Sequence, residues 1–125
     1  PVAKECLVGT APESGYRIAV PPLFIKNLSV GDVVAVERNE EGDVVAWSYI
    51  EKSNRSTVWI MVRGENSIDD AVECLKKLKC NVEEFEEYRY FAIDVPEECT
   101  LEQLDSCLEK VGDEKASVAF PSLRH

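Results

Sequence analysis

The sequence has almost no histidine. His125 is the only one in 125 residues, although histidine is the side chain best suited to acid–base chemistry near neutral pH. A glycine-rich phosphate loop, a His-Glu-x-x-His pair and a Gly-x-Ser-x-Gly turn are also missing. These absences point away from histidine-based catalysis and leave no catalytic residue to nominate. We therefore expect a protein that is not an enzyme and binds no cofactor.

Long apolar runs are missing as well. No segment approaches the roughly 20 apolar residues of a membrane span. No signal-peptide pattern opens the chain. We expect no membrane contact and a cytoplasmic location.

Basic residues are in short supply. There are 14 Lys and Arg residues against 24 Asp and Glu residues, giving a formal net charge of −10. Such a surface repels phosphate backbones, so we expect no direct nucleic-acid binding. It attracts basic proteins and accelerates encounters with them. Solubility alone is the simpler interpretation of the same charge.

The cysteines form no metal-binding pattern. No Cys-x-x-Cys pair is present, and a second histidine is lacking, so we expect no metal site. Reduced thiols are the simplest expectation, with Cys74 and Cys107 acting as small apolar residues on helix faces. Cys99 precedes a predicted helix start, but Glu97 and Glu98 oppose thiolate formation there. The five cysteines are Cys6, Cys74, Cys80, Cys99 and Cys107.

The first half of the chain is typical of short strands. Residues 16–20, 33–37 and 44–50 are rich in strand-forming side chains, and a short apolar run covers 6–8. Glycine and proline separate them, and residues 39–43 have the composition of a hairpin loop. This spacing predicts a curled sheet or partial barrel.

The second half alternates strands and helices. Strands are predicted at 57–62, 88–95 and 117–120, and residues 82–87, if they form a strand, add a fourth. Apolar residues at helical spacing follow Ser67, expected as an N-cap, and Thr100, which with Gln103 predicts a capping box. The resulting order β-α-β-β-α-β is the ferredoxin-like unit, with both helices on one face of an antiparallel sheet.

These patterns predict an α+β fold. An N-terminal β-rich portion, residues 1–55, packs on a C-terminal ferredoxin-like portion, residues 56–125. Because 125 residues match the usual size of one domain, we expect a single compact domain over 1–125.

Several motifs resemble one bacterial family. They are the runs 15–18, 22–24, 28–34, 51–58 and 92–96, which include Leu28-Ser29-Val30-Gly31-Asp32. In this order they resemble the family known as domain of unknown function 4265, over roughly residues 5 to 120. The resemblance supports the fold layout and implies no reaction and no catalytic residues.

An acidic stretch is the strongest candidate site. Ten of the acidic residues lie between Glu83 and Glu109, with Arg89 as the only basic residue there. Glutamates on an edge strand protect against aggregation, which is one interpretation. The other is a binding face, with glutamates steering a partner and aromatic side chains anchoring it. The candidate residues are Glu83, Glu84, Phe85, Glu86, Glu87, Tyr88 and Tyr90.

Two further segments have open interpretations. The polar run 51–57 suits either a turn or a site for a small anion. Trp47, Tyr49 and Trp59 alternate within strands and suit either a core or a partner site.

The leading hypothesis is a non-catalytic acidic protein-binding module. Its concrete form is a bacterial immunity protein that neutralises a toxin of the contact-dependent growth inhibition type, with a nuclease as the expected basic partner. An acidic face that mimics phosphate would occlude the basic active site. The alternative is a small-ligand-binding regulatory domain built on the ferredoxin-like sheet.

Overall fold

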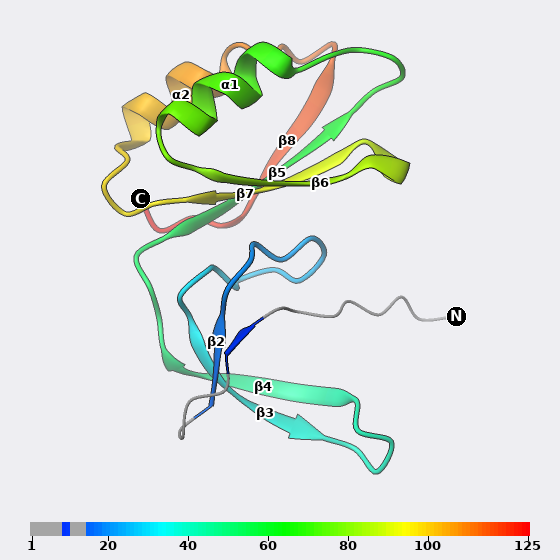
Figure 1. Cartoon of the computed structure of the whole chain (residues 1–125), viewed down its shortest axis with the longest axis vertical. Coiled ribbons are helices and arrows are strands. Elements are labelled where there is room, and N and C mark those ends of the chain that lie inside the picture. The colour runs from blue at the N-terminus through cyan, green and yellow to red at the C-terminus, as the bar shows by residue number, and fades with distance from the viewer. Residues whose placement is uncertain (1–8, 11–14) are drawn as a thin grey trace.

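The chain folds into two antiparallel sheets and two α-helices, so the α+β prediction is confirmed (Figure 1). The computed structural model describes residues 9–10 and 15–125. The apolar run at 6–8 lies outside these residues. We refer to the described residues up to Arg55 as the N-terminal lobe and to Ser56–Ser122 as the C-terminal lobe.

The N-terminal lobe contains an open sheet of strand order β1-β2-β3-β4. Its strands are β1 (Gly9–Thr10), β2 (Tyr16–Ile18), β3 (Val33–Arg38) and β4 (Val44–Glu51). The predicted hairpin loop joins β3 to β4, where the Asn39 side chain accepts the backbone N–H groups of Glu41 and Asp43, both at 3.0 Å. The strands pair linearly within the described residues and do not close into a barrel.

The C-terminal lobe contains the second sheet, of order β6-β7-β5-β8. Its strands are β5 (Ser56–Val62), β6 (Asn81–Phe85), β7 (Tyr90–Val95) and β8 (Ala116–Ser122), with a 3-10 helix η1 (Glu86–Tyr88) before β7. Helix α1 (Asp69–Lys77) connects β5 to β6, and α2 (Leu101–Leu108) connects β7 to β8. Both helices cover one face of this sheet, and the N-terminal lobe lies on the other side (Figure 1).

The sequence predicted helix N-caps at Ser67 and Thr100. The Thr100–Gln103 capping box at α2 is confirmed, with Gln103 N–H donating to Thr100 Oγ1 at 3.1 Å and Thr100 N–H donating to Gln103 Oε1 at 3.0 Å. The prediction for α1 was off by one position. Ile68 is the N-cap, and Ser67 Oγ accepts the Asp69 N–H at 3.3 Å from just outside the helix. Ile68 is buried in the core, so packing fixes this start.

The main core lies between the helices and the C-terminal sheet. It combines alternate residues of the strands with the apolar faces of both helices, as the 2.0 and 3.6 periodicities require. A smaller cluster fills the N-terminal lobe around Ile18, Leu28 and Val34. The fully enclosed apolar side chains of the main core include Val58, Ile60, Leu75, Ile93, Val95 and Leu104.

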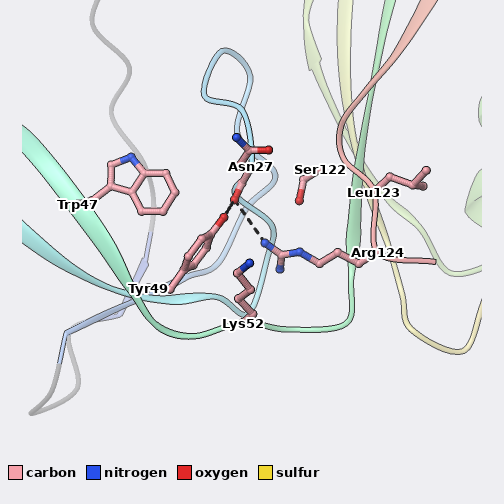
Figure 2. Close-up of a pocket in the computed structure, with 7 residues that line it drawn as sticks. All are labelled: Asn27, Trp47, Tyr49, Lys52, Ser122, Leu123 and Arg124. Carbon is pink, nitrogen blue, oxygen red and sulfur yellow. Dashed lines mark hydrogen bonds between the residues drawn. The ribbon is translucent and has the colours of Figure 1, made fainter.

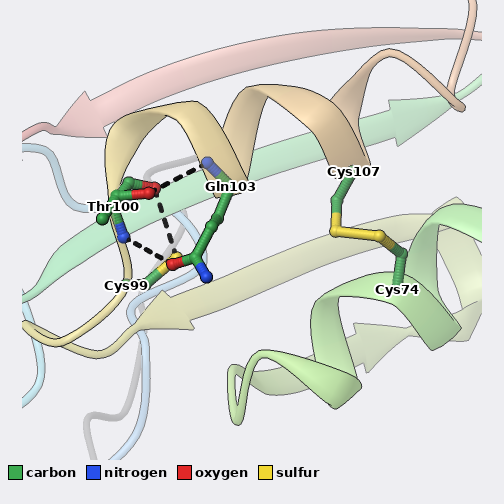
Figure 3. Close-up of a disulfide and its surroundings, with 5 residues drawn as sticks. All are labelled: Cys74, Cys99, Thr100, Gln103 and Cys107. Carbon is green, nitrogen blue, oxygen red and sulfur yellow. Dashed lines mark hydrogen bonds between the residues drawn. A yellow bond between two sulfur atoms is a disulfide. The ribbon is translucent and has the colours of Figure 1, made fainter.

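The expectation of reduced cysteines is wrong at one pair. Cys74 of α1 and Cys107 of α2 form a disulfide with a Cα–Cα distance of 5.5 Å (Figure 3). Both helices place their apolar stripes on the same sheet face, so these two positions face each other within the Cα range of a disulfide. Sequence spacing alone did not reveal this, because the two cysteines lie 33 positions apart. Cys80 and Cys99 are free and buried.

No helix in the described part of the chain is long and apolar enough to cross a membrane.

Candidate functional site

The acidic stretch lies at an edge of the C-terminal sheet. β6 pairs only with β7 in the strand order of the described residues. The acidic stretch therefore begins on an edge strand, as the sequence predicted. Glu83 and Glu84 lie in β6, and Glu86 and Glu87 lie in the 3-10 helix that follows. All four glutamates are exposed.

The four carboxylates do not share one face. In β6, Glu84 lies opposite Phe91 and beside Val82, on the helix-covered side of the sheet. Glu83 and Phe85 alternate with them and lie on the side of the N-terminal lobe. A partner that approaches the sheet from the side of the N-terminal lobe contacts Glu83 and Phe85. The Glu84 side chain lies on the opposite side of the sheet, away from such a partner.

A row of aromatic side chains in contact, here called the aromatic chain, extends from the interior to this edge. Successive ring centroids are 6.1 Å apart for Trp59 and Tyr90, 5.6 Å for Tyr90 and Phe24, 6.2 Å for Phe24 and Phe85, and 5.1 Å for Phe85 and Tyr88. The chain begins at the half-buried Trp59 and ends at Tyr88, which is 63% exposed. Phe24, which comes from the loop after β2, is 53% exposed.

The structure therefore divides the predicted site residues. Tyr90 is buried, at 7% exposure, and belongs to the packing between the lobes. Phe85 and Tyr88 reach the surface together with Phe24, which the sequence did not single out because it lies far from them along the chain. Arg89 has a positive φ of 51° and donates to the Asn66 carbonyl oxygen, so its guanidinium is engaged away from the glutamates.

The polar run 51–57 binds the protein's own carboxylates. Asp32 is fully buried, and its oxygens accept the backbone N–H groups of Ser29 at 2.8 Å and Ser53 at 2.9 Å. Asp94 is fully buried too, and Arg55 donates to it through Nε at 2.8 Å and Nη2 at 2.6 Å. This run forms a turn whose polar groups satisfy buried anions.

The structure explains why the Leu28–Asp32 motif contains a glycine followed by an aspartate. Gly31 has a φ of +87°, a conformation that L-residues avoid, and a Cβ there would lie 3.1 Å from Ser53 Cβ. The turn that Gly31 permits brings Asp32 to both the Ser29 and Ser53 N–H groups. Arg124, from the C-terminal segment, closes the arrangement with two hydrogen bonds to Asp32, one of them at 2.9 Å.

These arginines are held charged. Hydrogen bonding to Asp94 raises the pKa of Arg55, and hydrogen bonding to Asp32 raises the pKa of Arg124, each against the opposing effect of burial. A bidentate arginine on a buried carboxylate is the geometry that compensates its desolvation best. The Arg124–Asp32 pair joins the segment that follows the C-terminal lobe to the N-terminal lobe.

His125 also has a structural partner. Its Nε2–H donates to the Pro96 carbonyl oxygen at 2.7 Å, and its Nδ1 shares a hydrogen bond of 2.6 Å with the Ser56 hydroxyl. Ser56 is fully buried, and its oxygen accepts the Arg124 backbone N–H at 2.7 Å. A serine enclosed in this way offers no approach to a substrate, so the pair anchors the C-terminal segment.

The free thiols are poorly set for chemistry. Burial, reinforced by Cys99 and Asp94 and opposed by Arg55, raises the pKa of Cys80 to about 12. Burial also raises the pKa of Cys99. Thiolates are the reactive form, so neither thiol is activated at neutral pH. Within the described residues, no group of His, Cys, Asp and Glu side chains is arranged to hold a metal ion.

The three aromatic residues of the strands have different roles. Trp59 lies between the lobes, where its indole N–H donates to the Pro22 carbonyl oxygen at 2.8 Å. Trp47 and Tyr49 are half-buried in the N-terminal lobe, pack edge-to-face with centroids 5.0 Å apart, and also line a cavity of about 450 Å³. This cavity lies where β4 meets the C-terminal segment (Figure 2).

A family model described as "Domain of unknown function (DUF4265)" matches residues 5–119. The chain belongs to this family. The resemblance seen in the sequence motifs is thereby confirmed, and the buried Asp32 network gives one of those DUF4265 motifs its structural basis.

A solved structure shares the fold. It is a crystal structure of a hypothetical protein from Neisseria gonorrhoeae, 23% identical, with a TM-score of 0.78 over 97% of this chain and 84% of that chain. At this level of identity the similarity shows the fold alone. No curated protein matches this DUF4265 chain.

Proposed function

We propose that this protein is a non-catalytic module that binds a basic protein partner. The observation that carries the proposal is an aromatic edge formed by exposed Phe24 and Tyr88 and half-buried Phe85, with Glu83, Glu86 and Glu87 beside it. We call these six residues the aromatic–acidic edge. Aromatic side chains in the centre of an interface supply most of its affinity, and surrounding charge accelerates encounter.

The charge distribution supports a basic partner. The described residues contain no salt bridge to any of these three glutamates, and the nearby Arg89 bonds elsewhere. Their negative field is therefore not cancelled locally. Combined with a net charge of −10, it favours a positively charged surface over nucleic acid or an acidic protein.

Capture from the native host's lysate, with a matched pair of charge variants, tests this proposal. Glu83→Lys with Glu87→Lys changes the edge, and Glu102→Lys in α2 with Glu109→Lys at its C-cap makes the same charge change elsewhere. We expect the wild type and the α2 variant to retain a common basic protein, and the edge variant and Tyr88→Ala to lose it. Equal retention by all four proteins would remove the aromatic–acidic edge from the mechanism.

The finer form of the proposal is an immunity protein. The partner would then be a toxin domain of the contact-dependent growth inhibition type, with a nuclease active site that the acidic edge occludes. Acidic charge around an aromatic anchor supports this form, because a phosphate-binding site is basic. The test is the nuclease activity of the captured partner, which should be inhibited by the wild type and spared by the edge variant.

We propose that the C-terminal lobe is a ferredoxin-like unit. The element order β5-α1-β6-β7-α2-β8 and the strand order β6-β7-β5-β8, with both helices on one face, support this description. The proposed location remains the cytoplasm, where most disulfides are reduced. Fractionation of host cells tests the location, because the protein should then be recovered with cytoplasmic marker proteins.

A further inference from the structure

The cavity beside Tyr49 differs in charge from the rest of the molecule. Of the described residues that line it, none is acidic and two are basic, in a chain with 24 Asp and Glu residues. Its volume of about 450 Å³ is in the range of small-molecule sites. The lining residues are Asn27, Trp47, Tyr49, Lys52, Ser122, Leu123 and Arg124.

Most polar groups of the cavity are already satisfied. Arg124 is bidentate on Asp32, and the Tyr49 hydroxyl donates to the Asn27 backbone oxygen (Figure 2). Ser122 Oγ lies 2.7 Å from Ser29 Oγ, in a hydrogen bond that joins the two lobes. These groups shape the cavity, and their pairing leaves them little capacity to bind a charged ligand.

Lys52 is different. Its ammonium lies 4.4 Å from the Tyr49 ring centroid, and no carboxylate in the described part of the chain pairs with it. The side-chain amide of Asn27 also has no hydrogen bond to another described residue, although its backbone oxygen is occupied. Lys52 is exposed at the cavity rim, so one uncompensated positive charge meets an incoming ligand.

Among its mostly polar lining residues, the cavity has two apolar surfaces at Trp47 and Leu123. The Trp47 ring and the Leu123 side chain lie on opposite sides, with Lys52 and Arg124 between them (Figure 2). Leu123 is 49% exposed and Trp47 is half-buried, so a ligand would cover apolar surface that water now contacts. Inorganic phosphate would use Lys52 but gain nothing from these two surfaces.

We propose that this cavity binds a small organic monoanion with a flat apolar body and one carboxylate. The body packs between Trp47 and Leu123, and the carboxylate meets Lys52, with the Asn27 amide as a neutral donor. The site lies between the lobes. The space between the helices and the C-terminal sheet is filled by the main core and offers no room for a ligand. The proposal does not depend on the protein-binding function.

The test uses a matched pair of probes and the intact protein. Indole-3-acetate carries the body and the charge, and indole-3-acetamide carries the body alone. ¹⁵N chemical shifts report binding through the Trp47 indole N–H and the Lys52 and Arg124 amides. We expect indole-3-acetate to shift these resonances at millimolar concentration and the acetamide to bind at least about tenfold more weakly, as loss of one ionic contact implies.

Two lysine variants make the result specific. Lys52→Gln should reduce indole-3-acetate affinity to that of the acetamide, whereas Lys110→Gln, the same change on an exposed lysine after α2, should leave it unaltered. Both substitutions are at exposed positions, so folding should be preserved. Equal affinity for the two probes, unchanged affinity in Lys52→Gln, or no shift at Trp47 with either probe would overturn the proposal.

Discussion

Asp94 shows how much depends on single side chains in this fold. It is fully buried in β7, where Arg55 and Asn81 donate three hydrogen bonds to its carboxylate. A buried carboxylate without its cation keeps the full cost of desolvation. Asp94 and Asp32 are therefore points where the loss of one partner has a large effect.

Arg55→Ala should lower the free energy of unfolding by about 3 to 5 kcal/mol, because it leaves Asp94 without its cation. The matched control is Arg17→Ala. Arg17 pairs with Glu51 at 3.6 Å, with side chains 50% and 65% exposed, and such a pair contributes less than about 1 kcal/mol. Urea unfolding measures both. Similar losses in the two variants would contradict the role given to Asp94.

The titration of Cys80 should make the free energy of unfolding decrease as the pH becomes alkaline. Its thiol has a pKa raised by burial from an ordinary value of 9.0 to about 12. Between these values the unfolded chain has released the proton and the folded protein still holds it. Stability from this group is therefore complete below pH 9 and is lost as pH rises towards 12.

Cys80→Ala should flatten the decline in the urea midpoint between neutral pH and roughly pH 10 to 11. The variant loses some stability at every pH through the missing sulfur, so the slope is the informative quantity. Val82→Ala, which removes apolar atoms from a nearby half-buried position, should keep the wild-type slope. Parallel slopes in all three proteins would show that Cys80 does not titrate as expected.

Helices and strands were more predictable than their connections. Strands β4 and β5 and helix α2 follow from alternation, β-branched content and the Thr100 capping box, which are all local signals. The α1 cap was misplaced because buried Ile68 decides it. β8 continues through Pro121, where a strand was predicted to stop, because β8 is an edge strand and a register shift against β5 accommodates the proline.

The candidate sites were predictable only in part. The acidic stretch is visible in composition, but Phe24 joins Phe85 only after the lobes pack. The bonds from Asp94 to Arg55 and from Asp32 to Arg124 span 39 and 92 positions. No local pattern encodes such partners, since any of the basic residues could have filled the role.

The disulfide should stabilise the packing of α1 on α2. A link between residues 33 positions apart is expected to contribute about 3 to 4 kcal/mol by restricting the unfolded chain. Reductant should lower the urea midpoint of the wild type accordingly. It should leave a Cys74→Ala, Cys107→Ala variant unchanged. Peptide mapping without reductant should recover Cys74 and Cys107 in one linked species, and its absence would contradict the assignment.

The two lobes should unfold together. Their interface holds the Arg124–Asp32 pair, the Ser29–Ser122 hydrogen bond and the bond from Trp59 to Pro22. These contacts tie the small N-terminal core to the larger one, so a compact domain over the whole chain remains the prediction.

Two single-tryptophan variants test this coupling. Trp59→Phe leaves Trp47 to report on the N-terminal lobe, and Trp47→Phe leaves Trp59 to report on the interface. In each variant, fluorescence and far-ultraviolet circular dichroism should give the same urea midpoint. A fluorescence transition for Trp47 that precedes the loss of helix signal would instead show that the N-terminal lobe opens first.

The ion pair between Arg124 and Asp32 also has a consequence for folding during translation. Asp32 leaves the ribosome 92 residues before the arginine that neutralises it. At typical rates of synthesis this interval is roughly 5 to 20 seconds. During it the N-terminal lobe has a carboxylate with no cation and no second lobe to cover Leu28 and Pro22. The nascent chain therefore exposes its future interface until Arg124 has been synthesised, and chaperones have that period in which to bind it.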